Sequence, residues 1–183
     1  AHAPRLERAV DAVEDAAAAR GAAQVVRDPD HEFDFRGCSD SSATADTGFN
    51  GTGITATAKN GANCSAEGMV FDGSDDYVDV TPWPFGGEAM TVEAYVKFDT
   101  LNYWSNVMSF GDGPNDDSVL LANNQETGTA RWRVCFDGIS TEEVLESSSA
   151  SFFVASAWVH VVATVDAATM KLYKDGVNDN TKT

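Results

Sequence analysis

The chain of 183 residues carries twenty-nine acidic and twelve basic residues, which gives a formal net charge of −17. This excess of negative charge repels the phosphate backbone of nucleic acids and anionic membrane surfaces, so neither is expected as a partner. Hydrophobic residues make up 43% of the sequence, which is enough for a packed core. No apolar run approaches the ~20 residues of a transmembrane helix.

The N-terminal segment predicts a short helix over residues 4–20, followed by a linker. Apolar residues recur at helical spacing on one face, namely Leu6, Val10, Val13 and Ala17. This face is narrow and rich in alanine, so the helix must pack on the following domain or on another chain. We therefore divide the chain into a helix and linker, residues 1–30, and one domain, residues 31–183.

Strand patterns follow one another from residue 32 onward. The clearest is 89–98, where Met90, Val92, Ala94, Val96 and Phe98 share one face. The other predicted strands lie within 32–37, 53–58, 68–73, 76–81, 103–113, 118–123, 129–138, 151–156, 158–167 and 169–176. Turn residues at roughly ten-residue intervals are typical of an all-β sandwich. The connections are too short for crossover helices, which favours antiparallel pairing.

The stretch EGMVFDGSDDYVDV, residues 67–80, concentrates acids in a turn. We predict that its two strands pair as a hairpin around Gly73. Asp72, Asp75 and Asp76 offer carboxylates to a metal ion. An Asx-type turn, in which an aspartate accepts a backbone hydrogen bond, is the favoured interpretation.

Three cysteines suggest one disulfide and one remaining thiol. Cys38 and Cys64 lie in irregular sequence and are the predicted pair, whereas Cys135 lies in a predicted strand and is expected to be buried. Two sequons place candidate glycosylation sites at Asn50 and Asn63. Together these features favour a secreted, cell-surface or lumenal location, and other organelle lumens also fit.

Six motifs in order suggest a family: EGMVFDGSDDYVDV, MTVEAYVKF, WSNVMSFGDG, WRVCFDG, WVHVVATVD and MKLYKDG. Over about residues 32–176 the chain resembles the laminin-G-like, concanavalin-A-like jelly-roll superfamily, in particular its pentraxin-like branch. The resemblance implies a two-sheet antiparallel sandwich that binds carbohydrate or protein ligands, often with calcium, within a larger secreted or surface protein. In this family further strands follow the MKLYKDG hairpin. We therefore expect closing strands from more chain or from a partner.

The loop FGDGPNDDSVLL is the predicted calcium site, with Asp112, Asn115, Asp116 and Asp117 as oxygen ligands. By resemblance, the pair Asp116 and Asp117 matches in position the acidic–amide pair that supplies calcium ligands in pentraxins. The remaining pentraxin ligands come from the segment that would follow this chain. A solvated Asn/Asp/Gly turn is the alternative interpretation of this loop.

Aromatic residues outside the predicted core are candidates for stacking on a sugar. Trp83 lies between prolines in a connection, and Tyr103 begins a predicted strand together with Trp104. Both Trp83 and Tyr103 are predicted ligand contacts. Trp132 and Trp158 lie within or at the start of strands and are predicted to belong to the core.

Catalysis is not expected. Retaining glycosidases need two carboxyl groups about 5 Å apart, and jelly-roll glucanases carry them on an E-x-D-x-x-E or E-x-D-x-E strand, which this sequence lacks. Glu93 has no acidic neighbour on its strand, and Glu142 and Glu143 are adjacent, so they point opposite ways if extended. His160 is expected at a half-exposed strand position, and no histidine has zinc-site spacing.

The sequence therefore predicts a non-catalytic carbohydrate- or protein-binding adhesion module of a larger secreted, surface or lumenal assembly, with Ca2+ as its cofactor. Two alternatives stay open. One is a purely structural subunit whose helix and open sheet edge pack on partner chains without a small ligand. The other is a degenerate relative of the glycoside hydrolases.

Overall fold

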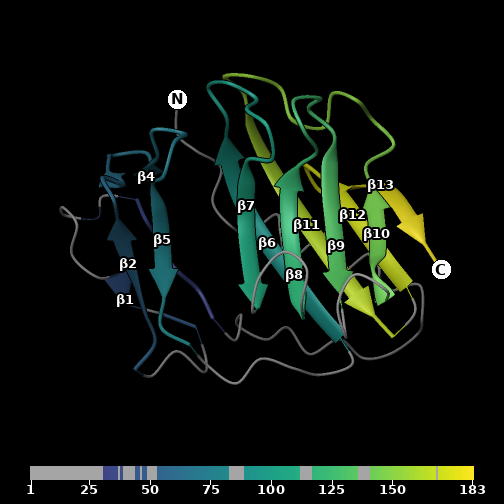
Figure 1. Ribbon diagram of the computed structural model, residues 1–183, viewed down its shortest axis with the longest axis horizontal. Coiled ribbons are helices and arrows are strands. Elements are labelled where there is room, and N and C mark those ends of the chain that lie inside the picture. The colour runs from purple at the N-terminus through teal and green to yellow at the C-terminus, as the bar shows by residue number, and fades with distance from the viewer. Residues whose placement is uncertain are drawn as a thin grey trace. The chain divides into compact units, whose positions relative to one another are not determined.

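The computed structural model describes residues 31–36, 38, 44–45, 47–48, 53–82, 89–111, 117–135, 141–167 and 169–183. Their regular structure is almost entirely antiparallel β-strand, as predicted (Figure 1). They fall into two compact units, one within Val25–Gly86 and one within Gly87–Thr183. The predicted helix at residues 4–20 lies outside the described residues. Within the described part of the chain, no helix is long and apolar enough to cross a membrane.

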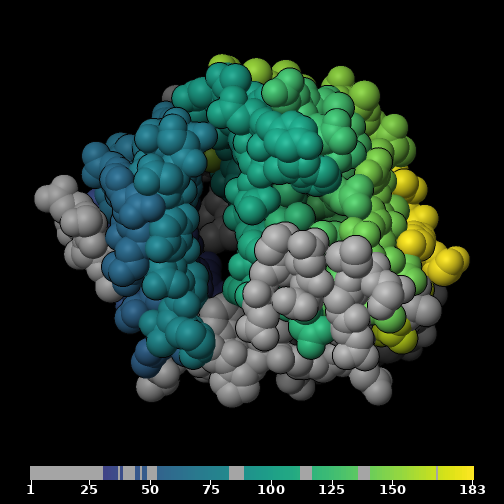
Figure 2. Space-filling model, in the orientation of Figure 1, coloured from purple at the N-terminus to yellow at the C-terminus, as the bar shows by residue number. Residues whose placement is uncertain are grey.

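The unit within Gly87–Thr183 consists of two four-stranded antiparallel sheets. The front sheet, with strand order β10-β9-β8-β7, contains β7 (Asn106–Gly111), β8 (Ser118–Asn123), β9 (Ala130–Cys135) and β10 (Glu143–Glu146). The back sheet, with order β13-β12-β11-β6, contains β6 (Ala89–Lys97), β11 (Trp158–Asp166), β12 (Thr169–Lys174) and β13 (Val177–Lys182). The front sheet lies over the back sheet in Figure 1, and its outward face is the face of this unit that Figure 2 shows.

The core of this unit forms between the inward faces of the two sheets. The front sheet contributes Val119, Leu121, Trp132, Val134 and Leu145, and the back sheet contributes Val159, Val161, Ala163, Met170 and Leu172. The Trp132 side chain is fully buried, and its Nε1 donates a hydrogen bond of 3.2 Å to the carbonyl oxygen of Thr164 in the other sheet. The predicted inward face of β6 packs against this core, which confirms the alternation in residues 89–98.

The predicted strand at residues 151–156 is wrong. Phe152 and Phe153 are both buried in a turn between β10 and β11, and their rings meet edge to face with centroids 5.0 Å apart. An extended backbone would place two consecutive side chains on opposite faces, so one ring would lie outside the core. The turn is held by the Phe153 amide, which donates to the Gly128 carbonyl oxygen at 2.7 Å.

The residues after the MKLYKDG motif form β13, which the sequence did not predict. Side chains link its edge to the edge of the front sheet. Ser148 donates to Asp179 twice, from its amide to Oδ2 (2.7 Å) and from its hydroxyl to the carbonyl oxygen (2.9 Å). The Lys182 ammonium lies 2.6 Å from a carboxylate oxygen of Glu143. These contacts join the two sheets along the β10 and β13 edges.

The unit within Val25–Gly86 contains two small antiparallel sheets. The three-stranded sheet has the order β1-β2-β5, and the two-stranded sheet pairs β3 with β4. Their bounds are β1 (Thr44–Ala45), β2 (Thr55–Lys59), β3 (Asn63–Cys64), β4 (Met69–Val70) and β5 (Tyr77–Val80). Cys38 and Cys64 form a disulfide with Cα atoms 5.5 Å apart, which confirms the predicted pair. Cys135 is buried outside this disulfide, also as predicted.

The predicted hairpin at residues 67–80 is wrong in its pairing. The strand before the turn, β4, pairs with β3, and the strand after it, β5, pairs with β2. Alternation of apolar and polar residues identified both strands, but it carries no information about which strand lies alongside. Tyr77 faces Lys59 and Val70 faces Asn63, so both partners precede the turn in the chain.

The predicted strand at residues 32–37 is not seen either, since residues 32–35 have no regular structure and Arg36 lies in a turn. Asp34 bonds locally instead. Its Oδ1 accepts the backbone amide and the Nε of Arg36, both at 2.9 Å, and its Oδ2 accepts Nη2 at 2.7 Å. Such local bonds compete with pairing in a sheet. The contact also lowers the pKa of Asp34, chiefly through the side-chain hydrogen bond from Arg36.

One buried polar residue fixes the turn between β8 and β9. The Asn123 side chain is fully buried, and its Nδ2 donates to the carbonyl oxygens of Asn102 (3.1 Å) and Gln125 (2.6 Å). Its Oδ1 accepts the amide of Gly128 at 3.0 Å. A single side chain therefore bonds to three backbone groups, of which the Gly128 amide is buried.

We expect Asn123→Ala to lower the free energy of unfolding by about 2 kcal/mol, because the buried Gly128 amide loses its acceptor and the carbonyl oxygens of Asn102 and Gln125 each lose one of two donors. Denaturant unfolding followed by circular dichroism measures the change. Asn124→Ala is the matched control, since that side chain makes no hydrogen bond among the described residues, and it should change stability by less than about 0.5 kcal/mol. Equal effects of the two substitutions would contradict the role of Asn123.

Candidate functional site

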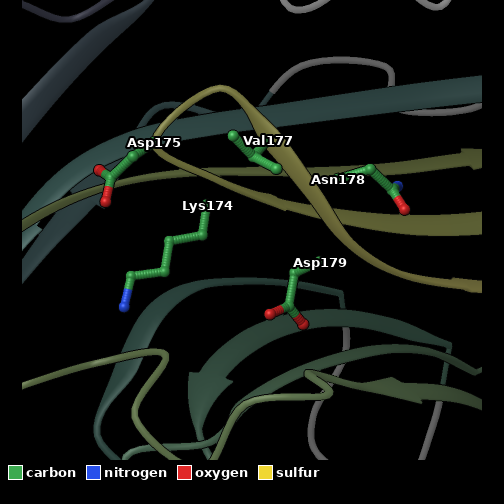
Figure 3. A pocket seen from close by; sticks show the side chains of 5 residues that line it. All are labelled: Lys174, Asp175, Val177, Asn178 and Asp179. Atoms are coloured by element: carbon green, nitrogen blue, oxygen red, sulfur yellow. The ribbon is translucent and has the colours of Figure 1, made fainter.

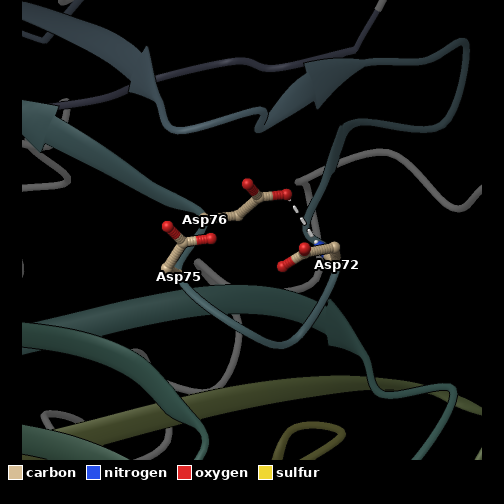
Figure 4. Close-up of side chains that lie close together, drawn as sticks. All are labelled: Asp72, Asp75 and Asp76. Carbon is tan, nitrogen blue, oxygen red and sulfur yellow. Dashed lines mark hydrogen bonds between the residues drawn. The ribbon is translucent and has the colours of Figure 1, made fainter.

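Three aspartates of the first unit converge on one turn, here called the acid turn: Asp72, Asp75 and Asp76. One carboxylate oxygen from each lies within 4.8 Å of the others (Figure 4). Asp72 Oδ1 accepts the amide of Ser74 at 2.7 Å, which is the predicted Asx-type turn. Asp76 Oδ2 accepts the amide of Asp72 at 2.8 Å. Two of the three carboxylates are thus already bonded to the backbone.

The predicted calcium loop is described only at its ends. Gly111 faces Ser118 in the β7–β8 ladder, and Ser118 faces Cys135 in the β8–β9 ladder. Asp117, which directly precedes Ser118 in the chain, is exposed. Gly111 has φ of 112°, and a Cβ there would collide with the carbonyl oxygen of Asp117, so glycine allows the two ends to approach. Asp112, Asn115 and Asp116 lie outside the described residues.

The outward face of the front sheet carries a charged cluster around Arg131. Its Nη1 lies 2.8 Å from Glu146 Oε1, and its Nη2 lies 3.1 Å from Glu142 Oε1. The guanidinium also sits over the Trp104 ring, 5.4 Å from the centroid. Glu143 turns away to Lys182, so the two adjacent glutamates have different partners, as their alternation predicted.

Tyr103 is exposed to 66% of its surface, next to this cluster. Its ring meets that of Trp104 edge to face, with centroids 6.1 Å apart. The two residues form a turn before β7 rather than the start of the strand, and Trp104 has a positive φ of 54°. The structure therefore places one predicted ligand contact, Tyr103, where a ligand can reach it. The other, Trp83, lies outside the described residues.

The outward face of the back sheet carries an aromatic pair that sequence reasoning missed. Tyr95 and Trp158 stack with centroids 4.9 Å apart and planes within 4°, and the Lys97 ammonium lies 5.2 Å from the Trp158 centroid. Trp158 was predicted in the core, but Val159 faces the core, so its neighbour Trp158 points outward and is 37% exposed. The alternation around Val159 was the signal that could have placed it.

His160 lies beside this pair and is half-buried, as predicted. Its ring Nε2 is 2.8 Å from Glu93 Oε1, and its backbone amide donates to Asp175 Oδ1 at 3.0 Å. The strand register places His160 opposite Tyr95. These contacts fix the imidazole to the sheet surface.

A pocket of about 320 Å³ lies at the β12–β13 hairpin and is here called the hairpin pocket (Figure 3). It is lined by Lys174, Asp175, Val177, Asn178 and Asp179. The sequence YKDG was interpreted only as a mark of the fold, so these residues were missed as a site. The polar run that follows the turn, residues 178–183, was the available signal.

Of the two candidate glycosylation sites, Asn63 lies in the described part of the chain. Asn63 is exposed in β3, and the next residue, Cys64, is held by the disulfide. Asn50 lies outside the described residues. The exposure of Asn63 leaves its side chain accessible to a modifying enzyme.

These observations define a two-sheet antiparallel β-sandwich with polar side chains gathered at its turns and on its outward faces. The chain belongs to the concanavalin A-like lectin/glucanases superfamily, since a laminin-G-type family model of that description matches residues 72–183. This confirms the predicted resemblance.

Comparison with solved structures adds one similarity. Residues 221–444 of an S-layer domain-containing protein from Clostridium thermocellum are 23% identical in sequence, with a TM-score of 0.46, over 86% of this chain and 72% of that one. A likeness of this degree carries no argument about function. No curated protein matches the chain.

Substitutions in the acid turn test whether its carboxylates repel one another, hold the backbone or bind a cation. We expect Asp75→Asn to raise stability at low ionic strength, because it removes one of three neighbouring negative charges, and we expect high salt to cancel the gain. Asp72→Ala should lower stability by about 1 kcal/mol, since the Ser74 amide loses its acceptor. Thermal melts of both variants at low and high NaCl measure this. If CaCl2 stabilises the wild type but not Asp75→Asn, the acid turn binds a cation and is more than a structural turn.

Proposed function

We propose that this protein is a non-catalytic carbohydrate- or protein-binding adhesion module of a larger secreted, surface or lumenal assembly. Membership of a superfamily of lectins and glucanases supports a carbohydrate ligand. The glucanase strand signature is absent from the sequence. Of the two activities in the name of the superfamily, lectin and glucanase, the features of this chain therefore support the lectin activity, which is binding without hydrolysis.

The observation that carries this proposal is the state of the carboxylates on the front sheet. Glu142 and Glu146 both bond to the guanidinium of Arg131, and Arg133 Nη1 lies 3.7 Å from Glu142. A retaining glycosidase instead needs one carboxyl group as a proton donor and another as a nucleophile facing the sugar. Carboxylates engaged by arginines serve poorly in either role, which supports binding without hydrolysis.

The location is proposed from the covalent chemistry of the chain. Disulfides such as Cys38–Cys64 persist in oxidising compartments and are rare where thiols are kept reduced. The exposed sequon residue Asn63 fits the same setting. These features support a location outside the cell or in a lumen. We propose that the protein acts there as one part of a larger protein or a multi-subunit assembly.

Calcium is the proposed cofactor, bound in the loop that begins after Gly111. The donor set of Asp112, Asn115, Asp116 and Asp117 offers carboxylate and amide oxygens, the ligands that calcium prefers. The close approach of Gly111 to the Asp117 carbonyl brings the ends of the loop together. The exposed ring of Tyr103, and Trp83 in sequence, are the proposed aromatic contacts for a glycan.

We expect the protein to bind glycans that are displayed on an array, and we expect it not to hydrolyse them. Soluble oligosaccharides incubated with the protein and analysed for new reducing ends should show no turnover, and Glu142→Gln should leave that result unchanged. A comparison of Tyr103→Ala with wild type on the array tests the aromatic contact. Turnover by the wild type that Glu142→Gln abolishes would show an enzyme and overturn the proposal.

Calcium should raise the melting temperature of the wild type. At a calcium concentration about 100 times the dissociation constant, the expected gain is about 2.7 kcal/mol. Asp116→Ala and Asp117→Ala should remove the gain, and Asp75→Asn in the acid turn is the matched control that should keep it. Titration calorimetry with no heat, together with an unchanged melt, would exclude calcium. The array experiment, repeated with a chelator, would then show whether glycan binding is independent of calcium.

A further inference from the structure

The hairpin pocket uses none of the residues assigned above to calcium or to an aromatic ligand contact. Its five lining residues come from the end of β12, the turn and the start of β13. Its volume of about 320 Å³ falls within the ~300–1,000 Å³ of small-ligand sites. Asp175 and Gly176 both have positive φ, 50° and 81°, which is the geometry of a tight two-residue hairpin turn.

The charged side chains of the pocket are each held by one hydrogen bond that involves the backbone. The three bonds run from Ser148 N to Asp179 Oδ2 (2.7 Å), from His160 N to Asp175 Oδ1 (3.0 Å) and from Lys174 Nζ to Ser151 O (2.6 Å). Side chains fixed in this way lose little rotamer freedom when a ligand binds, which lowers the entropic cost of binding.

Each of these groups keeps hydrogen-bonding capacity after its anchoring bond. An ionised carboxylate accepts through two oxygens, and an ammonium donates through three N–H groups. Asp175 and Asp179 therefore each retain an oxygen without a bond, and Lys174 retains two N–H donors. Val177, 69% exposed, adds an apolar surface at the same place. Fixed acceptors, a donor and an apolar patch complement the hydroxyl groups and C–H face of a sugar ring.

The charge of the pocket selects among sugars. In Figure 3 the Lys174 side chain lies between the carboxylates of Asp175 and Asp179. An anionic sugar would meet these two carboxylates and a chain of net charge −17. The ammonium of an amino sugar can donate to the carboxylates but accepts no hydrogen bond from Lys174. The hydroxyl groups of a neutral sugar both donate and accept, so they can bond to the carboxylates and to the Lys174 ammonium together.

We propose that the hairpin pocket binds one neutral sugar residue of a glycan. This inference rests on the proposed function and names the ligand class and a second place where that ligand is held.

Amide NMR spectra of the 15N-labelled chain, titrated with methyl glycosides of glucose, galactose and mannose, test the proposal. At least one of the three should shift the amide signals of residues 174–179, with weak, saturable binding. Asp175→Asn and Asp179→Asn keep an oxygen for the anchoring bond but replace the spare oxygen with an N–H donor. Each should weaken binding about tenfold. Asp166→Asn, exposed at the end of β11 in the same sheet, is the control and should bind as the wild type does.

Val177→Glu provides a second variant, because this exposed position tolerates substitution and the loss of the apolar surface should weaken binding. Glucuronic acid and glucosamine test the ligand class, and tighter binding of either than of the neutral glycosides would overturn it. If the array shows glycan binding while these variants bind like the wild type, the pocket is the wrong site and the proposed function survives. If no glycan binds on the array or in the titration, the pocket proposal fails together with the carbohydrate-binding part of the proposed function.

Discussion

The burial of Trp132 between two sheets is the constraint on which the larger unit depends. Its ring fills the space between the front and back sheets, and its indole N–H is satisfied by Thr164 across that space. A buried tryptophan without such an acceptor would leave a polar group unpaired. This hydrogen bond therefore links the front sheet to the back sheet within the core. Leu121 and Leu145 face Trp132 in the neighbouring strands and complete the front layer.

The same core decides where binding chemistry can lie. Inward faces are used by apolar side chains, so polar groups gather on outward faces, at loop ends and in hairpin turns. Gly111 brings the ends of one loop together, and the Asp175–Gly176 turn shapes the hairpin pocket. The polar residues at these positions can therefore vary without a change in the packing of the core. This agrees with the general separation of fold from function.

The structural role of each carboxylate in this chain depends on its hydrogen-bond partners. Asp72 accepts a backbone amide and shapes a turn, whereas Glu142 bonds to an arginine on a sheet surface. Asp175 and Asp179 each accept one backbone amide through one oxygen and line the hairpin pocket. In sequence these are similar acids near glycine or on short polar strands. Only the donors that surround them in space distinguish the acid turn, the ion pair and the hairpin pocket.

The sequence by itself determined the all-β class, most of the strands and the inward face of β6, because the alternation of apolar and polar residues is a local property. It also determined the Cys38–Cys64 pair, because the chain has only three cysteines and two of them lie in irregular sequence. Local patterns could not tell that β4 pairs with β3 and β5 with β2. They also missed the outward position of Trp158 and the cluster at the β12–β13 hairpin. Strand partners and shared pockets are set by contacts between residues far apart in the chain, so only the tertiary structure decided them.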